Sequence, residues 1–388
     1  MSELEKQNKG KDEGHIAMPH KGGKAWLAIM VVVLAIVIVI AGAFATGILS
    51  TSSNRESVTL TGAGATFPMP LILKWADEYY KTTGHSVKIN YGGGGSGLGV
   101  TQIKQKNVDF AGSDAPLKAN ESSEYGLVHI PETLGSVVVA YNEPSISTLK
   151  LDGPTVAKIY MKNITAWDDP AIAALNPGVV LPSKQIKVIA RSDSSGTTFV
   201  FSGYLAKISS EFQTLYGQGK SVSWTVDVAA NGNPGVTQTV LTTPRSIGYV
   251  ELSYAVTNNV QFAQLKNHDG NFVVASPETT SAAAAAASGS LPAGDGDWSH
   301  VNILDAPGPD SYPIATFTYI LVYKELYNDQ SKMNKTAAKA LVDFLWWAIH
   351  QDGQSYASGL YYAPLPASVV ALNEATLNSI TYNGVALR

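Results

Sequence analysis

ARSDSSGTTFVF, residues 190–201, joins a strand-like run, Ile186 to Ala190, to a helix-like run, Phe199 to Ile208. Residues 194–197 are therefore expected at a helix N-terminus, where free backbone N–H groups and the helix dipole favour an anion. Arg191 adds a planar, bidentate positive charge. The stretch predicts a strand–turn–helix unit whose turn binds an oxyanion.

The same residues allow a simpler interpretation. Ser and Thr before a helix commonly act only as caps. An arginine and an aspartate two residues apart commonly form a surface ion pair of little consequence. This stretch alone leaves both interpretations open, so the choice depends on whether other stretches supply matching pieces.

Two further stretches repeat the strand–turn–helix pattern. Residues 58–68 run a short strand into a glycine turn, with Thr66 as a candidate cap and Pro68 in the first turn of the next helix. A strand from Val87 to Tyr91 leads to GGGGSGLG, residues 92–99, ahead of another helix. Glycines there permit positive φ and close backbone approach to a ligand. The match to a dinucleotide fingerprint is weak, because any glycine run satisfies it and no acidic residue follows at the required distance.

VDFAGSDAP, residues 108–116, predicts a buried strand that ends in a polar turn. Asp114 at the carboxyl end of this strand is placed to face a crevice. The alternative is a turn aspartate that bonds its own backbone.

The remaining elements alternate. Gly135 to Tyr141 is a buried strand that could cross to a second lobe. Further strands are expected at 222–226, 247–251 and 318–322, and further helices at 155–159, 282–287 and 341–349, the last carrying a tryptophan pair, Trp346 and Trp347, expected in the core. Strands that alternate with helices predict α/β layers with parallel sheets.

Composition narrows the class of protein. A chain of 388 residues suggests two domains, and 45% hydrophobic against 15% charged residues allows a large core. The net charge of −4 gives no nucleic-acid signal. The chain has no cysteine, and its histidines do not fall at metal-ligand spacing, so we expect no disulfide, metal or cofactor.

The N-terminal sequence indicates a targeting or membrane-anchoring segment. Residues 1–26 are polar and are expected to be a disordered cytoplasmic leader. Residues 27–49 carry no charge and are long enough to span a bilayer, and lysines just before them place the N-terminus in the cytoplasm. The alternative is a secretory signal cut after Ala43-Phe44-Ala45. Either way residues 50–57 form a tether, and the chain from residue 58 onward lies outside the cell membrane, where sequons at Asn120, Asn163 and Asn334 could be glycosylated.

Four segments together resemble the signature segments of the periplasmic phosphate-binding proteins, the substrate receptors of ABC-type phosphate importers. They are TGAGATFP at 61–68, AGSDAP at 111–116, RSDSSGTTFVF at 191–201 and IGYV at 247–250. The resemblance covers about residues 58–366, in order and with similar spacing. Residues 167–170 and 312–314 also resemble family landmarks.

The resemblance implies a two-lobed α/β periplasmic-binding-protein fold of type II character with a hinge, here preceded by one N-terminal transmembrane helix. Lobe I would comprise residues 58–138 and 312–388, and lobe II residues 139–311. It implies a monomeric receptor, not an enzyme, that captures inorganic phosphate and delivers it to the permease subunits and ATPase of an ABC transporter. The transmembrane span would replace the cleaved signal or lipid anchor common in the family.

Carried over position by position, the resemblance also implies a set of ligand contacts. Backbone N–H groups and hydroxyls would bind phosphate, Arg191 would be its charge partner, Asp193 would orient Arg191, and Asp114 would accept a proton from the ligand. The implied binding residues are Thr66, Phe67, Ser96, Asp114, Arg191, Asp193, Ser195, Gly196 and Thr197. The four glycines before Ser96 depart from the family, which often has a bulkier residue there.

Two other functions stay open. The first is binding of another oxyanion, such as arsenate, sulfate or molybdate. The second is a surface phosphatase or esterase that uses Ser195 or Ser96 as nucleophile, but no histidine lies near either serine in sequence to act as its base.

Overall fold

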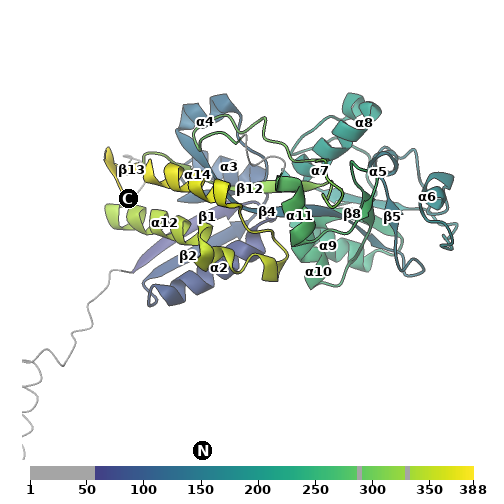
Figure 1. Cartoon of the computed structure of the whole chain (residues 1–388), viewed down its shortest axis with the longest axis horizontal. Coiled ribbons are helices and arrows are strands. Elements are labelled where there is room, and N and C mark those ends of the chain that lie inside the picture. Colours follow the sequence, from purple (N-terminus) through teal and green to yellow (C-terminus); the bar gives the residue numbers. More distant parts are fainter. Residues whose placement is uncertain (1–56, 286–290, 328–332) are drawn as a thin grey trace, which may run out of the picture. The chain divides into compact units, whose positions relative to one another are not determined.

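Residues 57–285, 291–327 and 333–388 are described by a computed structural model of the chain, and within them a nine-stranded mixed sheet forms the centre (Figure 1). Its strand order is β2-β1-β3-β12-β4-β8-β6-β7, and β9 pairs with β4 off this path. The strands are β1 (Val58–Gly64), β2 (Val87–Gly93), β3 (Phe110–Ser113), β4 (Leu127–Asn142), β6 (Lys187–Arg191), β7 (Val228–Ala230), β8 (Ser246–Glu251), β9 (Gln261–Phe262) and β12 (Ala315–Tyr323).

Helices cover both faces of the sheet, and two small sheets lie outside it. The helices are α2 (Met69–Thr82), α3 (Ser96–Lys104), α4 (Ala119–Tyr125), α5 (Gly153–Tyr160), α6 (Pro170–Leu175), α7 (Gly196–Ile208), α8 (Ser210–Leu215), α9 (Gly232–Thr242), α10 (Leu252–Thr257), α11 (Pro277–Ala285), α12 (Lys335–Ile349), α13 (Gln351–Gln354), the 3₁₀ turn Ser358–Leu360, and α14 (Ala367–Asn378). The small sheets are β5 (Lys150–Leu151) with β10 (Gln264–Lys266) and β11 (Phe272–Val273), and the hairpin β13 (Thr381–Tyr382) with β14 (Val385–Ala386).

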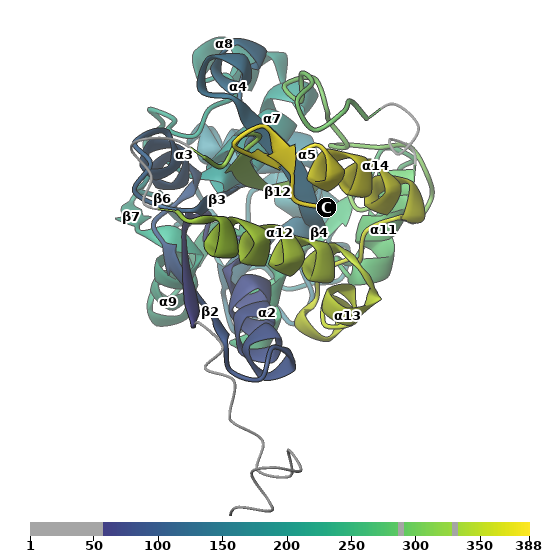
Figure 2. The same cartoon turned by 90° about the vertical axis from the view of Figure 1, so that its left-hand side faces the viewer.

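The sheet has two halves, each built from parallel strands and the helices between them. In the first half α2 connects β1 to β2 and α3 connects β2 to β3, so the two helices lie on opposite faces, and α12 packs beside α2 (Figure 2). In the second half α7 and α9 follow β6 and β7 in the same way. In both halves the helices begin at the carboxyl ends of parallel strands, where ligands bind in such sheets.

Strand β4 runs through both halves. It pairs with β12 up to Ser136 and with β8 from Val137 onward. All its residues except the last are buried, including the polar side chains His129, Glu132, Thr133 and Ser136. The chain returns beside this point, where Val137 N–H donates to the Ile314 carbonyl at 2.9 Å and the Tyr312 hydroxyl donates to the Val137 carbonyl at 3.2 Å. Two adjacent crossings therefore connect the halves.

Helix α2 illustrates how sequence spacing positions these elements. Its buried side chains recur every three or four residues, so one face packs on the sheet. The Trp75 indole N–H donates to the Gly353 carbonyl at 2.7 Å, which satisfies its polar atom inside the core. The predicted pair Trp346 and Trp347 packs against the same core but stays half-buried.

Three predictions about local structure are wrong. The sheet is mixed rather than parallel, because β12 and β4 run antiparallel to their neighbours. Residues 222–226 form no strand: Trp224 packs against Tyr160 and Phe201, and the two strands that pair with β6 are β7 and β8. Thr66 does not cap α2, whose N-cap is Pro68 without a side-chain hydrogen bond.

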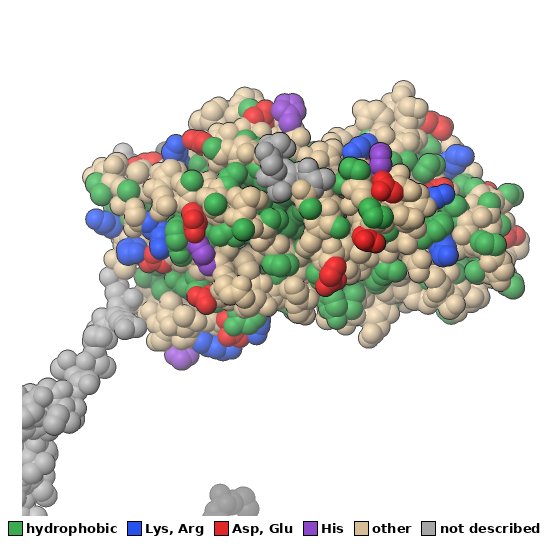
Figure 3. All heavy atoms as spheres, viewed as in Figure 1, with side chains coloured by type: hydrophobic (Ala, Val, Ile, Leu, Met, Phe, Trp, Pro, Cys, Tyr) green, Lys and Arg blue, Asp and Glu red, His purple; other side chains and the backbone are tan. Residues whose placement is uncertain are grey.

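The predicted leader (1–26), the uncharged span (27–49) and residues 50–56 of the tether lie outside the described residues. Within the described ranges, no helix is both long and apolar enough to cross a bilayer. All three predicted sequon asparagines are exposed. Figure 3 shows acidic and basic side chains of the described residues spread over one face of the molecule.

Candidate functional site

Four helices of the described chain begin close together, α2 and α3 from the first half of the sheet and α7 and α9 from the second. Direct contacts join them. Gly97 N–H donates to the Ser194 carbonyl at 2.9 Å, and Asn233 N–H donates to Thr66 Oγ1 at 3.0 Å. The predicted site residues are thus brought together at the junction of the two halves.

Arg191 and Asp193 form a buried bidentate pair. Arg191 Nε donates to Asp193 Oδ1 at 2.7 Å and Nη2 donates to Oδ2 at 2.5 Å. Their side chains are 1% and 7% exposed, so the interpretation as a surface ion pair is wrong. Burial opposes ionisation of Asp193, but the hydrogen bonds and charge of Arg191 and the Gly232 N–H outweigh it and hold the pKa of Asp193 below its usual value.

The N-terminus of α7 combines a cap with free donors. Ser195 is the N-cap, and its Oγ accepts from Thr198 N–H at 3.0 Å. The Ser195 N–H donates to the Lys220 carbonyl at 2.8 Å, so of the two polar hydrogens of Ser195 only that of the hydroxyl remains to donate. The N–H groups of Gly196 and Thr197 donate to no group in the described part of the chain. Thr197 Oγ1 accepts from Arg191 Nη1 at 3.1 Å.

Two tyrosine hydroxyls fix the turn before α2 by donating hydrogen bonds to its backbone carbonyls. The Tyr254 hydroxyl donates to the Thr66 carbonyl and the Tyr362 hydroxyl donates to the Phe67 carbonyl, each at 2.6 Å. Thr66 Oγ1 accepts from the backbone and side-chain nitrogens of Asn233, at 3.0 and 3.2 Å, which leaves its own hydrogen to donate. The N–H groups of Thr66 and Phe67 have no acceptor within the described residues.

Asp114 and Ser96 face this turn from the first half of the sheet. Asp114 N–H donates to Ser96 Oγ at 3.1 Å, and Thr318 Oγ1 donates to Asp114 Oδ1 at 2.9 Å. The carboxylate therefore does not bond its own backbone, and the turn-aspartate alternative is wrong. Burial raises the pKa of Asp114 to about 7, against the hydrogen bond from Thr318 and the charge of Arg191.

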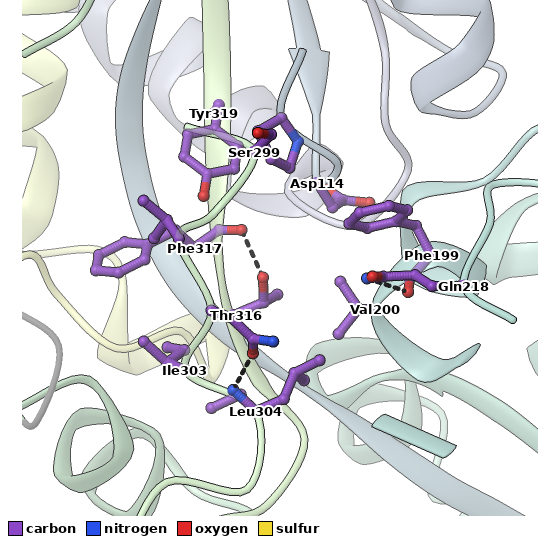
Figure 4. Close-up of a pocket in the computed structure, with 14 residues that line it drawn as sticks. Asp114, Phe199, Val200, Gln218, Ser299, Ile303, Leu304, Thr316, Phe317 and Tyr319 are labelled. Atoms are coloured by element: carbon purple, nitrogen blue, oxygen red, sulfur yellow. Dashed lines mark hydrogen bonds between the residues drawn. The ribbon is translucent and has the colours of Figure 1, made fainter. Parts of the chain in front are cut away.

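The carboxylate of Asp114 lies against the start of α7. A Cβ placed on Gly196 would come within 2.4 Å of Asp114 Oδ2 and 2.3 Å of Ser96 Oγ. Any side chain at position 196 would displace the carboxylate, so glycine is required there for close approach. On its other side Asp114 borders a small cavity of about 50 Å³, lined by Phe199, Val200 and Thr316 among others (Figure 4).

Asn233 is a site residue that the sequence analysis missed. It is fully buried, its Nδ2 donates to Thr66 Oγ1 and to Thr197 Oγ1 (3.1 Å), and its Oδ1 accepts from Glu251 N–H at 3.0 Å. It thereby ties the first half of the sheet to the second. The signal was available as a further strand–glycine–helix unit, AANGNPGV at residues 229–236, within a region read only as rich in glycine, asparagine and serine.

The arrangement suits a small anion that carries a hydrogen. Amide and hydroxyl donors converge, one cation is balanced by one carboxylate, and one further carboxyl is available as an acceptor. Within the described ranges no cluster of three or more potential ligands could hold a metal. No histidine of the described chain hydrogen-bonds to Ser195 or Ser96, as a serine nucleophile would need.

A family model described as a PBP superfamily domain matches residues 49–347. The chain is 42% identical over 325 residues to phosphate-binding protein PstS of Haemophilus influenzae, covering 83% of this chain and 93% of that protein. The chain belongs to the PstS family of phosphate-binding proteins. PstS of Xylella fastidiosa is 39% identical over 84% of this chain and 86% of its own length, and PstS of the archaeon Methanocaldococcus jannaschii is 37% identical over 89% and 92%.

Solved structures of this superfamily share the fold. A phosphate-binding protein from Stenotrophomonas maltophilia superposes with a TM-score of 0.62 at 20% identity, covering 83% of this chain and 93% of that one. A periplasmic phosphate-binding protein called PfluDING gives a TM-score of 0.60 at 21% identity, covering 82% and 92%. The PstS-family chain thus has the two-lobed α/β periplasmic-binding-protein fold, as predicted.

The raised pKa of Asp114 makes stability depend on pH. The folded, ligand-free chain keeps a proton that the unfolded chain releases between 3.8 and about 7, so the free energy of unfolding falls as pH rises through this window. We expect Asp114→Asn to raise the free energy of unfolding at about pH 8 by up to a few kcal/mol, since one pKa unit is worth about 1.4 kcal/mol.

Urea denaturation in phosphate-free buffer measures this effect. At about pH 4 the variant and the wild type should differ little, because Asp114 is protonated in the folded chain and still close to half protonated in the unfolded chain, so little of the pH-dependent penalty has developed. Asp310→Asn, an exposed aspartate, is the control and should show no such trend. A difference that stays constant from pH 4 to 8 would exclude a protonated Asp114.

Proposed function

We propose that this chain is an extracytoplasmic receptor that captures inorganic phosphate between its two lobes and delivers it to an ABC-type phosphate permease. The observation that carries the proposal is the buried Asp114 carboxyl beside the free N–H groups of Gly196 and Thr197 and the neutralised Arg191–Asp193 pair. The PstS relatives, up to 42% identical, support the same function.

The lobes are proposed as residues 58–138 with 312–388 and residues 139–311. The change of partner along β4 between Ser136 and Val137, and the return of the chain at Ile314, support these boundaries. One crossing lies within strand β4, and the other is the turn that leads into β12, so opening would bend and twist both while each lobe moves as a body.

The proposed ligand donors come from both lobes. Thr66, Phe67 and Ser96 donate from lobe I, through the free amides and the hydroxyls. Lobe II contributes the Ser195 hydroxyl, the Gly196 and Thr197 amides and Arg191, while Asp193 holds the guanidinium in place. These donors are numerous enough to give each oxygen of the anion a hydrogen bond. An unsatisfied polar group in a dry site would cost about 1–3 kcal/mol.

Asp114 is proposed to distinguish phosphate from sulfate. Phosphate near neutral pH carries a P–OH hydrogen, which an ionised carboxylate can accept. Sulfate has no hydrogen there, so it would meet a lone pair and a negative charge. Arsenate is protonated like phosphate, so Asp114 does not exclude it. No histidine of the described residues hydrogen-bonds to Ser195 or Ser96, which disfavours a phosphatase or esterase.

Calorimetric titration with an oxyanion panel tests this proposal. Phosphate and arsenate should bind at about pH 8, and sulfate should bind at least about 10³-fold more weakly, since a site built around a hydrogen bond rejects analogues that lack it. Asp114→Asn should lose most of this discrimination, whereas Asp310→Asn should retain it. Wild-type discrimination should also fall below pH 7, because Asp114 gains a proton there and can then donate to sulfate. Equal binding of phosphate and sulfate by the wild type would refute the proposal.

Asn233 is expected to contribute to affinity without touching the ion. Asn233→Ala removes three side-chain hydrogen bonds, one of which joins the lobes through Thr66, and should weaken phosphate binding about 10- to 100-fold, in line with the cost of unsatisfied buried groups. The matched control is Asn231→Ala, an exposed residue two positions away whose side chain caps nothing. Unchanged affinity in Asn233→Ala would show that the lobes do not need this contact.

The receptor is further proposed to be a monomer tethered by residues 27–49, with residues 1–26 in the cytoplasm. The absence of charge from 27 to 49 and the preceding Lys21 and Lys24 support an uncleaved anchor. Cleavage after Ala45 is the alternative, and the mass of the native N-terminal peptide distinguishes the two.

A further inference from the structure

A second carboxyl lies directly behind Asp114. Glu132, on β4, is 1% exposed, and its Oε1 lies 3.3 Å from Thr318 Oγ1. The same hydroxyl oxygen lies 2.9 Å from Asp114 Oδ1. Glu132 Oε2 has no hydrogen-bond partner among the described residues. Thr318 therefore stands between two buried carboxyls, one at the ligand site and one behind it.

A count of hydrogens decides how these groups can bond. Thr318 has a single hydroxyl hydrogen, and an ionised carboxylate can only accept. If both carboxyls were ionised, they would compete for that hydrogen, and Glu132 would keep a buried charge with a bare oxygen. If Glu132 carries a proton on Oε1, it donates to Thr318 Oγ1, and Thr318 donates to Asp114 Oδ1. Each donor then has an acceptor.

The surroundings of Glu132 favour the neutral acid. No lysine, arginine or histidine of the described chain pairs with its carboxyl. Gln354, from α13, donates to the backbone carbonyl of Glu132 and not to its side chain. The ionisable groups that interact electrostatically with Glu132 are Asp114, at the end of β3, and the Tyr91 phenol, on β2. Burial raises the pKa of Glu132 well above its usual value, and the charge of Asp114 raises it further.

We propose that Glu132 is a permanently protonated positioning residue, which donates to Thr318 and so commits the Thr318 hydrogen to Asp114 Oδ1. Asp114 Oδ2 accepts a long hydrogen bond from Ser96 Oγ, at 3.4 Å, and keeps a further lone pair as the acceptor for the hydrogen of the bound anion. Oδ2 is the oxygen that faces Gly196 at the start of α7, where the anion is proposed to bind. The identity of the anion rests on the proposed function, whereas the protonation of Glu132 does not.

This arrangement gives the two acids different tasks. Asp114 can change its charge near neutral pH, while Glu132 keeps the hydrogen-bond chain pointing in one direction. Without the Glu132 donor, the Thr318 hydroxyl could turn away, and Asp114 Oδ1 would lose its fixed hydrogen. Discrimination between protonated and unprotonated anions would then weaken although no ligand contact had been removed.

Substitutions at both positions test the chain of bonds. Glu132→Gln keeps a donor of the same shape, so its ratio of phosphate to sulfate affinity and its pH profile should stay within about twofold of the wild type. Glu132→Leu and Thr318→Val break the chain and should reduce the ratio by at least about tenfold, and Thr318→Ser should restore it. A shifted pH profile in Glu132→Gln, or an unchanged ratio in Thr318→Val, would overturn the proposal.

Infrared spectroscopy tests the proton itself. The difference spectrum between the wild type and Glu132→Gln, in phosphate-free buffer at about pH 8, should contain the C=O stretch of a protonated carboxylic acid. Carboxylate bands in its place would overturn the inference. This measurement needs no ligand, so it still decides the proton if the protein proves not to bind phosphate, and it needs no Leu variant if that variant fails to fold.

Discussion

A buried carboxyl must have a hydrogen to accept, and the site depends on how that requirement is met. Asp114 is 2% exposed, and it reaches the centre of the site only because Gly196 leaves room for it. Thr318 supplies a hydrogen to one of its oxygens, and the other lies beside Gly196 at the start of α7. The positive charge of Arg191 is already offset by Asp193, so the ion must match the site mainly through its hydrogens and oxygens rather than through its total charge.

The same logic explains why the proposed donors lie at three helix N-termini, those of α2, α3 and α7, while the N-terminus of α9 supports Asp193 and Thr66. Backbone amides are directed donors that carry only a partial charge. The carbonyls of the turn that bears them are held in place by hydrogen bonds. The Tyr254 and Tyr362 hydroxyls that fix the turn before α2 show how far the supporting structure extends, since the Tyr362 hydroxyl also lies 3.1 Å from Oε2 of the buried Glu251. Rigid support of this kind keeps the donors in place before the ion arrives.

Local sequence patterns predicted the strand–turn–helix units of the candidate site, but not the contacts between residues that lie far apart in the sequence. Strand, turn and helix follow one another within the twelve residues 190–201, so periodicity and capping residues were enough to find them. The contact between Asn233 and Thr66 spans 167 positions, and that between Thr318 and Asp114 spans 204. Neither partner carries a local signature of its role. The direction of β4 and β12 was missed for the same reason, because antiparallel pairing is a property of the connection and not of the strand.

The two halves of the sheet contact each other directly, through Asn233 with Thr66 and through Gly97 with Ser194. Both contacts must therefore break before the two halves can separate around the proposed anion. Exchange would be gated by the protein's own opening rate and not by diffusion of the anion through solvent. A membrane partner that broke these two contacts would speed release of the anion without replacing any group that binds it.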